Sequence, residues 1–175
     1  MIKLRSELEL AVRIVDDFPI KGVRFRDIAP ILADNELFDF ALSEMVNGID
    51  LTIVDAFAGI ESRGFILGAA LSSKYKKGFI PIRKAGKSPP PVIAQSYQLE
   101  YGQATLEMSS MSTVTEGRRV VIIDDVLATG GTLGAAISLC ERAGLQIVDV
   151  RVLIDITKLN QFKFRGSGVE AVIRA

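Results

Sequence analysis

The sequence predicts an α/β domain: a mostly parallel, twisted sheet with helices on both faces. The first observation is an alternation along the chain between short apolar runs, rich in β-branched residues, and segments in which apolar residues recur at helical spacing. The second is that these runs are mostly apolar, as strands buried between layers of helices are. The candidate strands are residues 52–57, 79–83, 120–123 and 146–155. Ligands of such sheets bind beyond the carboxyl ends of the strands.

Size and composition favour one globular domain spanning residues 1–175, because 49% of the residues are hydrophobic and the length allows a sizeable core. Lys+Arg and Asp+Glu both number 21, so the formal net charge is zero, which argues against nucleic-acid binding through a general basic field. No apolar run has the length of a membrane span, and the N-terminus does not open like a signal peptide. With a single cysteine, Cys140, no internal disulfide is possible, and we expect a cytoplasmic protein without a membrane partner.

The chain contains no histidine. This removes the most common general base, the Ser-His triads and most transition-metal sites. Any catalysis therefore rests on carboxylates, Lys, Arg, Tyr and backbone dipoles.

The N-terminal part is predicted to hold two helices. Apolar residues from Leu4 to Val15 recur at helical spacing, so we expect a helix that ends near Asp16. Residues 17–22 break it, and residues 23–30 are expected to form a loop. Asp34 or Asn35 can cap a second helix that continues to Met45.

The rest of the chain supplies the sheet and its crossovers. After the strand at 52–57, a tight turn leads into a helix that starts at about Phe65, and a strand at 79–83 follows. Residues 84–102 are expected to form a long connection of the kind that acts as a lid or binding loop. Further elements are expected as a strand at 105–108, a helix at 133–143, an irregular stretch at 158–168 and a last strand at 169–173.

The stretch from Val120 to Thr132, VVIIDDVLATGGT, organises the site. A buried strand ends in Asp124 and Asp125, and a Gly- and Thr-rich loop then leads into a helix. Glycines let the backbone approach a ligand and turn its N–H groups inward, while a helix N-terminus attracts anions. The carboxylates would repel a phosphate, so their natural partners are sugar hydroxyls or a Mg²⁺ shared with the ligand. The pattern indicates a site for a phosphate on a sugar, and matches neither GxxxxGK[ST] nor GxGxxG.

Two further segments have the composition of anion sites. Residues 58–64 place two glycines, Ser62 and Arg63 in one turn at the end of a strand, which suits a pyrophosphate. An ordinary βα turn with a surface arginine has the same composition. Residues 83–89 set Arg83, Lys84 and Lys87 around a glycine, although most charge runs of this kind are solvated loops.

Together these motifs resemble a known family. Residues 120–132 resemble the phosphoribosyl-pyrophosphate (PRPP) signature of type I phosphoribosyltransferases. Residues 83–89 with 96–102 resemble the RKxGKxP…YxLEYG lid of the adenine phosphoribosyltransferase family, and residues 22–28 resemble its adenine-binding stretch. The resemblance runs from about Asp17 to Asp155 in four separate motifs. It implies the type I fold with a small N-terminal hood over the base, formed by residues 1–30, and a flexible lid at 84–104.

The resemblance also implies a role for each matching residue. The catalytic set would be Glu100, which takes the N9 proton of adenine, with Asp124 and Asp125 on the ribose hydroxyls and Arg63 on the pyrophosphate. The residues implied to bind the 5′-phosphate are Ala128, Thr129, Gly130, Gly131 and Thr132. Those implied to bind pyrophosphate are Glu61, Ser62, Arg63, Arg83, Lys84, Lys87 and Tyr101. Those implied to bind adenine are Arg24, Phe25 and Arg26. A cis peptide bond is implied between Glu61 and Ser62.

The implied reaction is adenine plus PRPP giving AMP and pyrophosphate. Mg²⁺ is carried by PRPP, and Asp124 and Asp125 are the candidate protein contacts of the ion. A homodimer is implied as well. Two alternatives stay open: a phosphoribosyltransferase for another base, such as hypoxanthine or xanthine, and a PRPP-sensing regulator with the same fold. Two residues depart from the family pattern: Arg24 stands where Val or Leu is usual, and Ser88 stands where Leu is usual.

Overall fold

The computed structural model describes residues 2–99 and 102–175. The chain divides into two compact units, one ending at Asn47 and one from Gly48 onward. The elements of the first unit are α1 (Ile2–Ala11), β1 (Arg13–Asp16), β2 (Arg24–Asp27), α2 (Ala29–Ala33) and α3 (Asn35–Met45). In the described chain, no helix combines the length and the hydropathy needed to cross a bilayer.

Two expectations for the first unit are wrong. The first helix ends at Ala11 instead of near Asp16, and the expected loop at 23–30 contains strand β2, which pairs antiparallel with β1. The β-branched Ile14-Val15 pair favours an extended chain, and pairing gives it a ladder. Two cross-strand ion pairs flank this hairpin, Arg13 to Asp27 at 2.8 Å and Arg24 to Asp16 at 3.0 Å.

The predicted second helix is confirmed. It is α3, and Asp34 is its N-cap: the carboxylate accepts hydrogen bonds from the backbone N–H groups of Glu36 (2.9 Å) and Leu37 (3.0 Å). These two bonds satisfy donors that the first helical turn leaves without partners.

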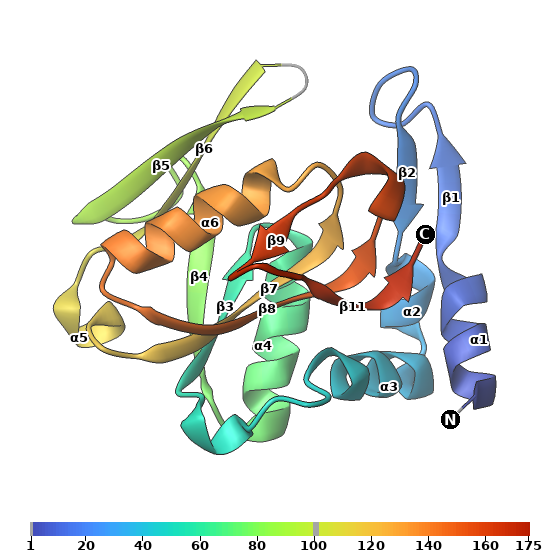
Figure 1. Ribbon diagram of the computed structural model, residues 1–175, viewed down its shortest axis with the longest axis horizontal. Helices are drawn as coiled ribbons and strands as arrows, with labels where there is room; N and C mark the ends of the chain where they lie inside the picture. The colour runs from blue at the N-terminus through green and yellow to red at the C-terminus, as the bar shows by residue number, and fades with distance from the viewer. Residues whose placement is uncertain (1, 100–101) are drawn as a thin grey trace. The chain divides into compact units, whose positions relative to one another are not determined.

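The second unit is built on a seven-stranded sheet in the order β11-β8-β7-β3-β4-β6-β5, drawn in Figure 1. Strands β11, β8, β7, β3 and β4 run parallel, and β6 and β5 add an antiparallel hairpin. The strands are β3 (Ala56–Ile60), β4 (Gly78–Lys84), β5 (Val92–Leu99), β6 (Gly102–Ser109), β7 (Arg119–Leu127), β8 (Gln146–Asp155) and β11 (Glu170–Arg174). The predicted fold class is confirmed.

Helices cover both faces of this sheet. The main ones are α4 (Arg63–Tyr75) and α6 (Gly131–Arg142), which lie on opposite sides of the strands in Figure 1. Val120 and Ile122 of β7 share a core cluster with Leu139 of α6. Their neighbours Val121 and Ile123 are also fully buried, although successive side chains of a strand point to opposite faces. Burial on both faces explains why the strand has no polar face.

Small elements complete the unit: η1 (Leu51–Ile53), α5 (Ser112–Thr115), η2 (Thr157–Leu159), and a short hairpin of β9 (Lys163–Phe164) with β10 (Ser167–Gly168). Two expectations need correction here. The strand expected at 52–57 starts at Ala56, because Asp50 caps a 3-10 turn through Thr52 N–H (2.9 Å). The long connection expected at 84–102 contains β5, which pairs with β6 along its whole length.

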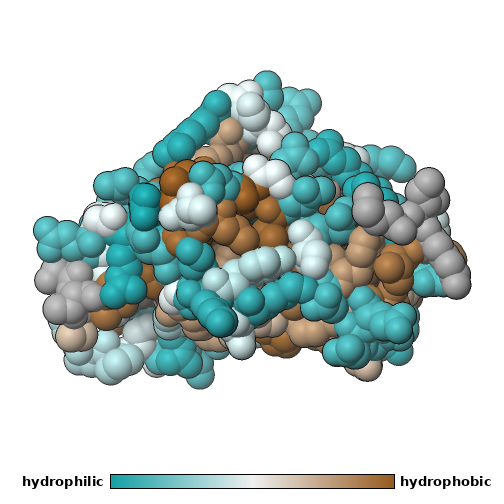
Figure 2. Space-filling model, turned by 90° about the horizontal axis from the view of Figure 1, so that it is seen from below, coloured by the Kyte–Doolittle hydropathy of each residue, from teal (hydrophilic) through white to brown (hydrophobic). Residues whose placement is uncertain are grey.

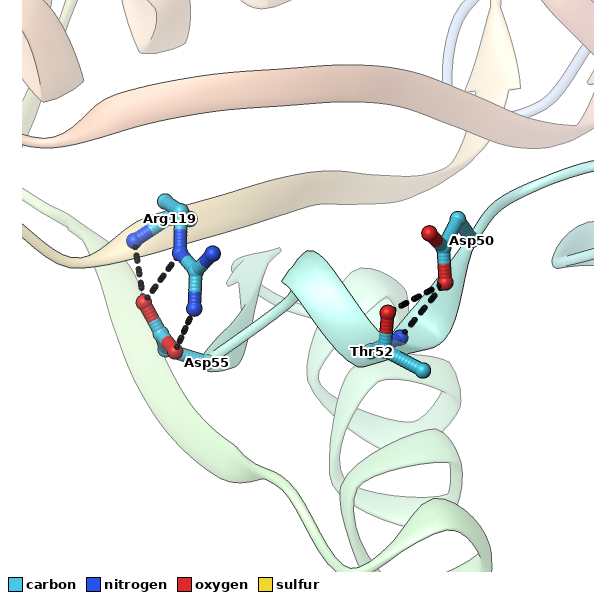
Figure 3. A network of polar contacts seen from close by, with 4 residues as sticks. All are labelled: Asp50, Thr52, Asp55 and Arg119. Carbon is cyan, nitrogen blue, oxygen red and sulfur yellow. Dashed lines mark hydrogen bonds and ion pairs between the residues drawn. The ribbon is translucent and has the colours of Figure 1, made fainter.

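A polar cluster ties the sheet together at the amino ends of its strands (Figure 3). Asp55, just before β3, accepts hydrogen bonds from the backbone N–H (2.9 Å), Nε (3.0 Å) and Nη2 (2.9 Å) of Arg119 at the start of β7. These bonds hold the pKa of Asp55 well below its usual range. They fix the register of the two strands whose other ends carry the site.

Candidate active site

A pocket of about 650 Å³ opens at the carboxyl ends of β3, β4 and β7. It unites the acid pair, the turn at 58–64 and the start of the basic loop, which are far apart in the sequence. Its lining residues are Glu61, Ser62, Arg63, Lys84, Ala85, Tyr97, Ala104, Thr105, Asp124, Asp125, Val126, Ala128 and Thr132. Three segments that the sequence analysis treated as separate candidate sites therefore meet at one edge of the sheet.

The two acids lie near the end of β7 and are almost buried, at 8% and 6% exposure. Asp124 Oδ1 accepts a hydrogen bond from the backbone N–H of Asp125 (2.9 Å), and Asp125 Oδ2 pairs with Nε of Arg63 (2.7 Å). Burial raises the pKa of Asp124 well above its usual value, and the charge of Asp125 raises it further. Burial also raises the pKa of Asp125, against the opposing effect of Arg63. The pocket therefore contains two buried acids whose ionisation costs free energy, and one of them, Asp125, pairs with a cation.

The turn at 58–64 brings the start of α4 against β7. A side chain at Gly64 would place its Cβ 2.7 Å from the carbonyl oxygen of Ile123, and one at Gly59 would lie 2.6 Å from the carbonyl oxygen of Gly64. Only glycine permits this approach, which places Arg63 beside Asp125. The peptide bond between Glu61 and Ser62 is cis, as the resemblance implied.

Residues 128–132 form the entry to α6. Gly130 is its N-cap and has φ +91°, a left-handed conformation that favours glycine. A Cβ at this position would lie 2.5 Å from the ring of Phe162. Ala128 and Thr132 line the pocket, whereas Thr129, Gly130 and Gly131 shape the turn without being among its lining residues.

The basic loop at 83–89 forms more hydrogen bonds within the protein than its sequence predicts. Of its three cations, Lys84 lines the pocket, and Arg83 Nη1 donates to the carbonyl oxygen of Lys87. Glu107 of β6 holds the loop in place, because its carboxylate accepts hydrogen bonds from three backbone N–H groups of the loop. Sequence reasoning missed Glu107, although a lone acid between Leu106 and Met108 in an apolar strand was an available signal.

A second residue that sequence reasoning left without a role is Tyr97 of β5. It lines the pocket, and its hydroxyl lies 3.4 Å from Oγ1 of Thr132. The antiparallel hairpin thus contacts the 128–132 loop. The predicted lid residues Glu100 and Tyr101 lie outside the described residues.

The three residues assigned to adenine belong to the first unit. Arg24, Phe25 and Arg26 are consecutive in β2. Phe25 is half-buried and packs edge-to-face on Phe18, with ring centroids 5.1 Å apart. Arg24 departs from the family pattern, and its side chain is used in the cross-strand pair with Asp16.

Comparison with known proteins agrees with this geometry. A family model described as the phosphoribosyl transferase domain matches residues 31–163. An adenine phosphoribosyltransferase of Bdellovibrio bacteriovorus is 48% identical over 169 residues, which cover 96% of this chain and 99% of the relative. The chain belongs to the adenine phosphoribosyltransferase family.

Solved structures of adenine phosphoribosyltransferases share the fold over the whole chain. The enzyme of Rhodothermus marinus superposes with a TM-score of 0.90 at 40% identity and full coverage of both chains. That of Saccharomyces cerevisiae, complexed with D-2,5-dideoxy-2,5-imino-altritol 1,6-bisphosphate and adenine, has a TM-score of 0.81 at 29% identity, with 98% of this chain and 99% of that one covered. The predicted family is confirmed.

The described residues of this family member offer few ligands for a metal. They contain no group of three or more His, Cys, Asp or Glu side chains that could hold an ion. The pocket provides the carboxylates of Asp124 and Asp125. Such a donor set fits Mg²⁺, which binds through one or two carboxylates and takes its other ligands from substrate phosphates and water.

Proposed function

We propose that this protein transfers the 5-phosphoribosyl group of PRPP to adenine, giving AMP and pyrophosphate. The observation that carries the proposal is the pocket in which Asp124 and Asp125, the 58–64 turn and Lys84 meet. The choice of adenine rests on the names of the relatives and on the adenine in the yeast complex.

In this proposal the loop at 128–132 and the start of α6 bind the 5′-phosphate. The helix offers unpaired N–H groups and the positive end of its dipole, and Thr129 and Thr132 add hydroxyl donors. The ribose hydroxyls then donate to the two carboxylates of the pocket, which relieves part of the cost of burying that pair.

The C1′–O bond to pyrophosphate breaks as the C1′–N9 bond forms, so negative charge develops on the leaving group. Lys84, Arg63, Arg83 and Lys87 are the cations that we assign to this charge, with Ser62 and Tyr101 as hydrogen-bond donors. Glu61 belongs to the same turn, but its carboxylate accepts a hydrogen bond from the backbone N–H of Lys84 (2.8 Å). It therefore fits a role in shaping the site better than contact with an anion.

Mg²⁺ bound with PRPP would add positive charge at the pyrophosphate, and Asp124 and Asp125 would hold it from the protein side. We assign Glu100 to accept the N9 proton of adenine. We also propose that residues 84–104 act as a lid that excludes water during the reaction, and that residues 1–30 bind the base through Arg24, Phe25 and Arg26.

A homodimer is the proposed assembly, on the family resemblance. Large apolar side chains such as Ile53 and Ile66 are 41% and 45% exposed, and Figure 2 shows hydrophobic surface gathered in patches between hydrophilic residues. A monomer mass from light scattering at micromolar concentration would overturn this assignment.

The test is a substrate panel. Purified protein with PRPP and Mg²⁺ is offered adenine, hypoxanthine, guanine, xanthine or orotate, and pyrophosphate release is followed with and without EDTA. We expect release with adenine alone and its loss with EDTA. The double variant D124N/D125N is the matched inactive control, with an expected fall of at least about 100-fold, or roughly 3 kcal/mol of transition-state stabilisation. Turnover of another base would refute the base assignment, and near wild-type activity of the double variant would refute the site.

A further inference from the structure

The basic loop at 83–89, whose three cations give it the composition of an anion site, already contains an anion. Glu107 lies on β6 and is 6% exposed. Its Oε1 accepts hydrogen bonds from the backbone N–H groups of Lys87 (2.7 Å) and Ser88 (2.6 Å), and its Oε2 accepts one from Gly86 (3.0 Å). The side chain of Ser88 also favours the ionised form of this carboxylate. These bonds, that from Gly86 first, hold the pKa of Glu107 below its usual value, so the side chain is ionised at neutral pH.

The preceding backbone donors of the loop are also used internally. Lys84 N–H donates to Oε2 of Glu61 (2.8 Å), and Ala85 N–H donates to the carbonyl oxygen of Thr105 (3.1 Å). Five consecutive N–H groups, from Lys84 to Ser88, therefore have acceptors within the protein. A phosphate that binds at this loop meets the side chains of its cations, since the backbone nest is occupied.

We propose that Glu107, together with Ser88, is a positioning residue for the pyrophosphate half of PRPP. It fills the nest of residues 86–88 and so fixes the loop that presents Lys84 and Lys87. This inference rests on the proposed function. It also gives a role to Ser88, the residue that replaces the usual leucine, because we assign its hydroxyl as a fourth donor to the same carboxylate.

Replacing Glu107 by glutamine keeps its shape but exchanges one acceptor oxygen for an NH₂ group, which faces backbone donors. We expect E107Q to bind PRPP and pyrophosphate at least 10-fold more weakly, measured by calorimetry with Mg²⁺ present. Affinity for AMP, whose phosphate we assign to the 128–132 loop and which carries no pyrophosphate, should stay within about 2-fold. E116Q, at an exposed glutamate outside the site, is the matched control. Equal losses for PRPP and AMP, or no loss for either, would overturn the proposal.

The serine supplies a second variant that is less disruptive to folding. S88A should weaken PRPP binding about 2- to 5-fold in the wild-type background and have no further effect in the E107Q background, because its hydroxyl acts through that carboxylate. Equal effects in both backgrounds would contradict the pairing. These binding measurements do not depend on turnover. If the wild type binds PRPP but converts no base, the proposed reaction is refuted, while the PRPP affinities of E107Q and S88A still test the role of Glu107.

Discussion

Asp124 and Asp125 are adjacent, nearly buried carboxylates, and Arg63 neutralises only part of their charge. Burying an ionised carboxylate without full compensation costs free energy, and the cost appears as the raised pKa of Asp124. The substrate would supply the missing donors. In the protein without substrate, the acid pair is a local source of instability, which the proposed hydrogen bonds from ribose hydroxyls would offset.

We expect D124N to be more stable than the wild type at neutral pH. The folded-state pKa of Asp124 is raised above its unfolded value, so the folded state binds the proton more tightly between the two values. Stability is therefore lost as pH rises through this window, and the full cost remains above the folded pKa. Asparagine keeps an oxygen that can accept from Asp125 N–H but carries no charge.

Thermal denaturation of both proteins from pH 5 to pH 8 checks this prediction. The difference in Tm should grow in favour of D124N as the pH rises from 5 toward 8, by about 2–4 °C for each ~1 kcal/mol. Asp55 does not interfere, because its lowered pKa keeps it ionised throughout this range. A difference that is independent of pH, or a less stable variant at pH 8, would show that burial of charge at Asp124 is not the dominant effect.

At the scale of elements, the entry to α6 depends on one glycine and one aromatic ring. Gly130 has φ +91°, and Phe162 occupies the space that its Cβ would need. Phe162 follows η2 and is held by its own N–H, which donates to the side chain of Asn160 (3.1 Å). The C-terminal segment, which carries no recognisable motif, thus supports the proposed phosphate loop.

G130A should destabilise the protein more than G166A does. Both positions have positive φ, so either alanine pays about 1–2 kcal/mol for the left-handed backbone. Nothing lies within 4 Å of a Cβ at Gly166, so only G130A also meets the ring. Urea unfolding should show the larger loss for G130A, together with weaker AMP binding, and F162A in that background should recover part of both. Equal losses for the two alanine variants would rule out the contribution of Phe162.

Sequence patterns predicted most of the parallel strands, because burial on both faces leaves a mostly apolar run such as 146–155, which matches β8 at both ends. The strand expected at 52–57 is the exception, since β3 starts at Ala56. The sequence patterns failed for strands that are polar and for residues whose contacts lie far away in the sequence. Strand β5 was hidden in the connection at 84–102, since Gln95, Ser96 and Gln98 give no apolar pattern and the strand exists through pairing with β6. Within the site, the phosphate and acid motifs were visible because glycines and acids are local signals. Glu107 and Phe162 act on segments 19 to 32 residues away. A local pattern such as the lone acid between Leu106 and Met108 can mark a residue, but it does not show which distant segment that residue contacts.

For the whole molecule, the assignments divide between the two units. The residues assigned to adenine lie in the unit that ends at Asn47, and those assigned to PRPP lie in the unit from Gly48 onward. The two substrates can therefore be perturbed separately, which distinguishes a base-binding role of β2 from a general structural role.

Phe25 is the residue on which this separation is tested. Loss of an aromatic side chain that stacks on a base costs about 1–3 kcal/mol, so F25A should raise KM for adenine roughly 5- to 150-fold. The dissociation constant of PRPP, measured without adenine, should stay within about 2-fold. I20A, which removes an apolar side chain 47% exposed in the same unit, is the control for general damage. If F25A weakens PRPP binding as much as it raises KM for adenine, or if I20A has the same effect, Phe25 supports the fold of its hairpin through Phe18 and does not stack on the base.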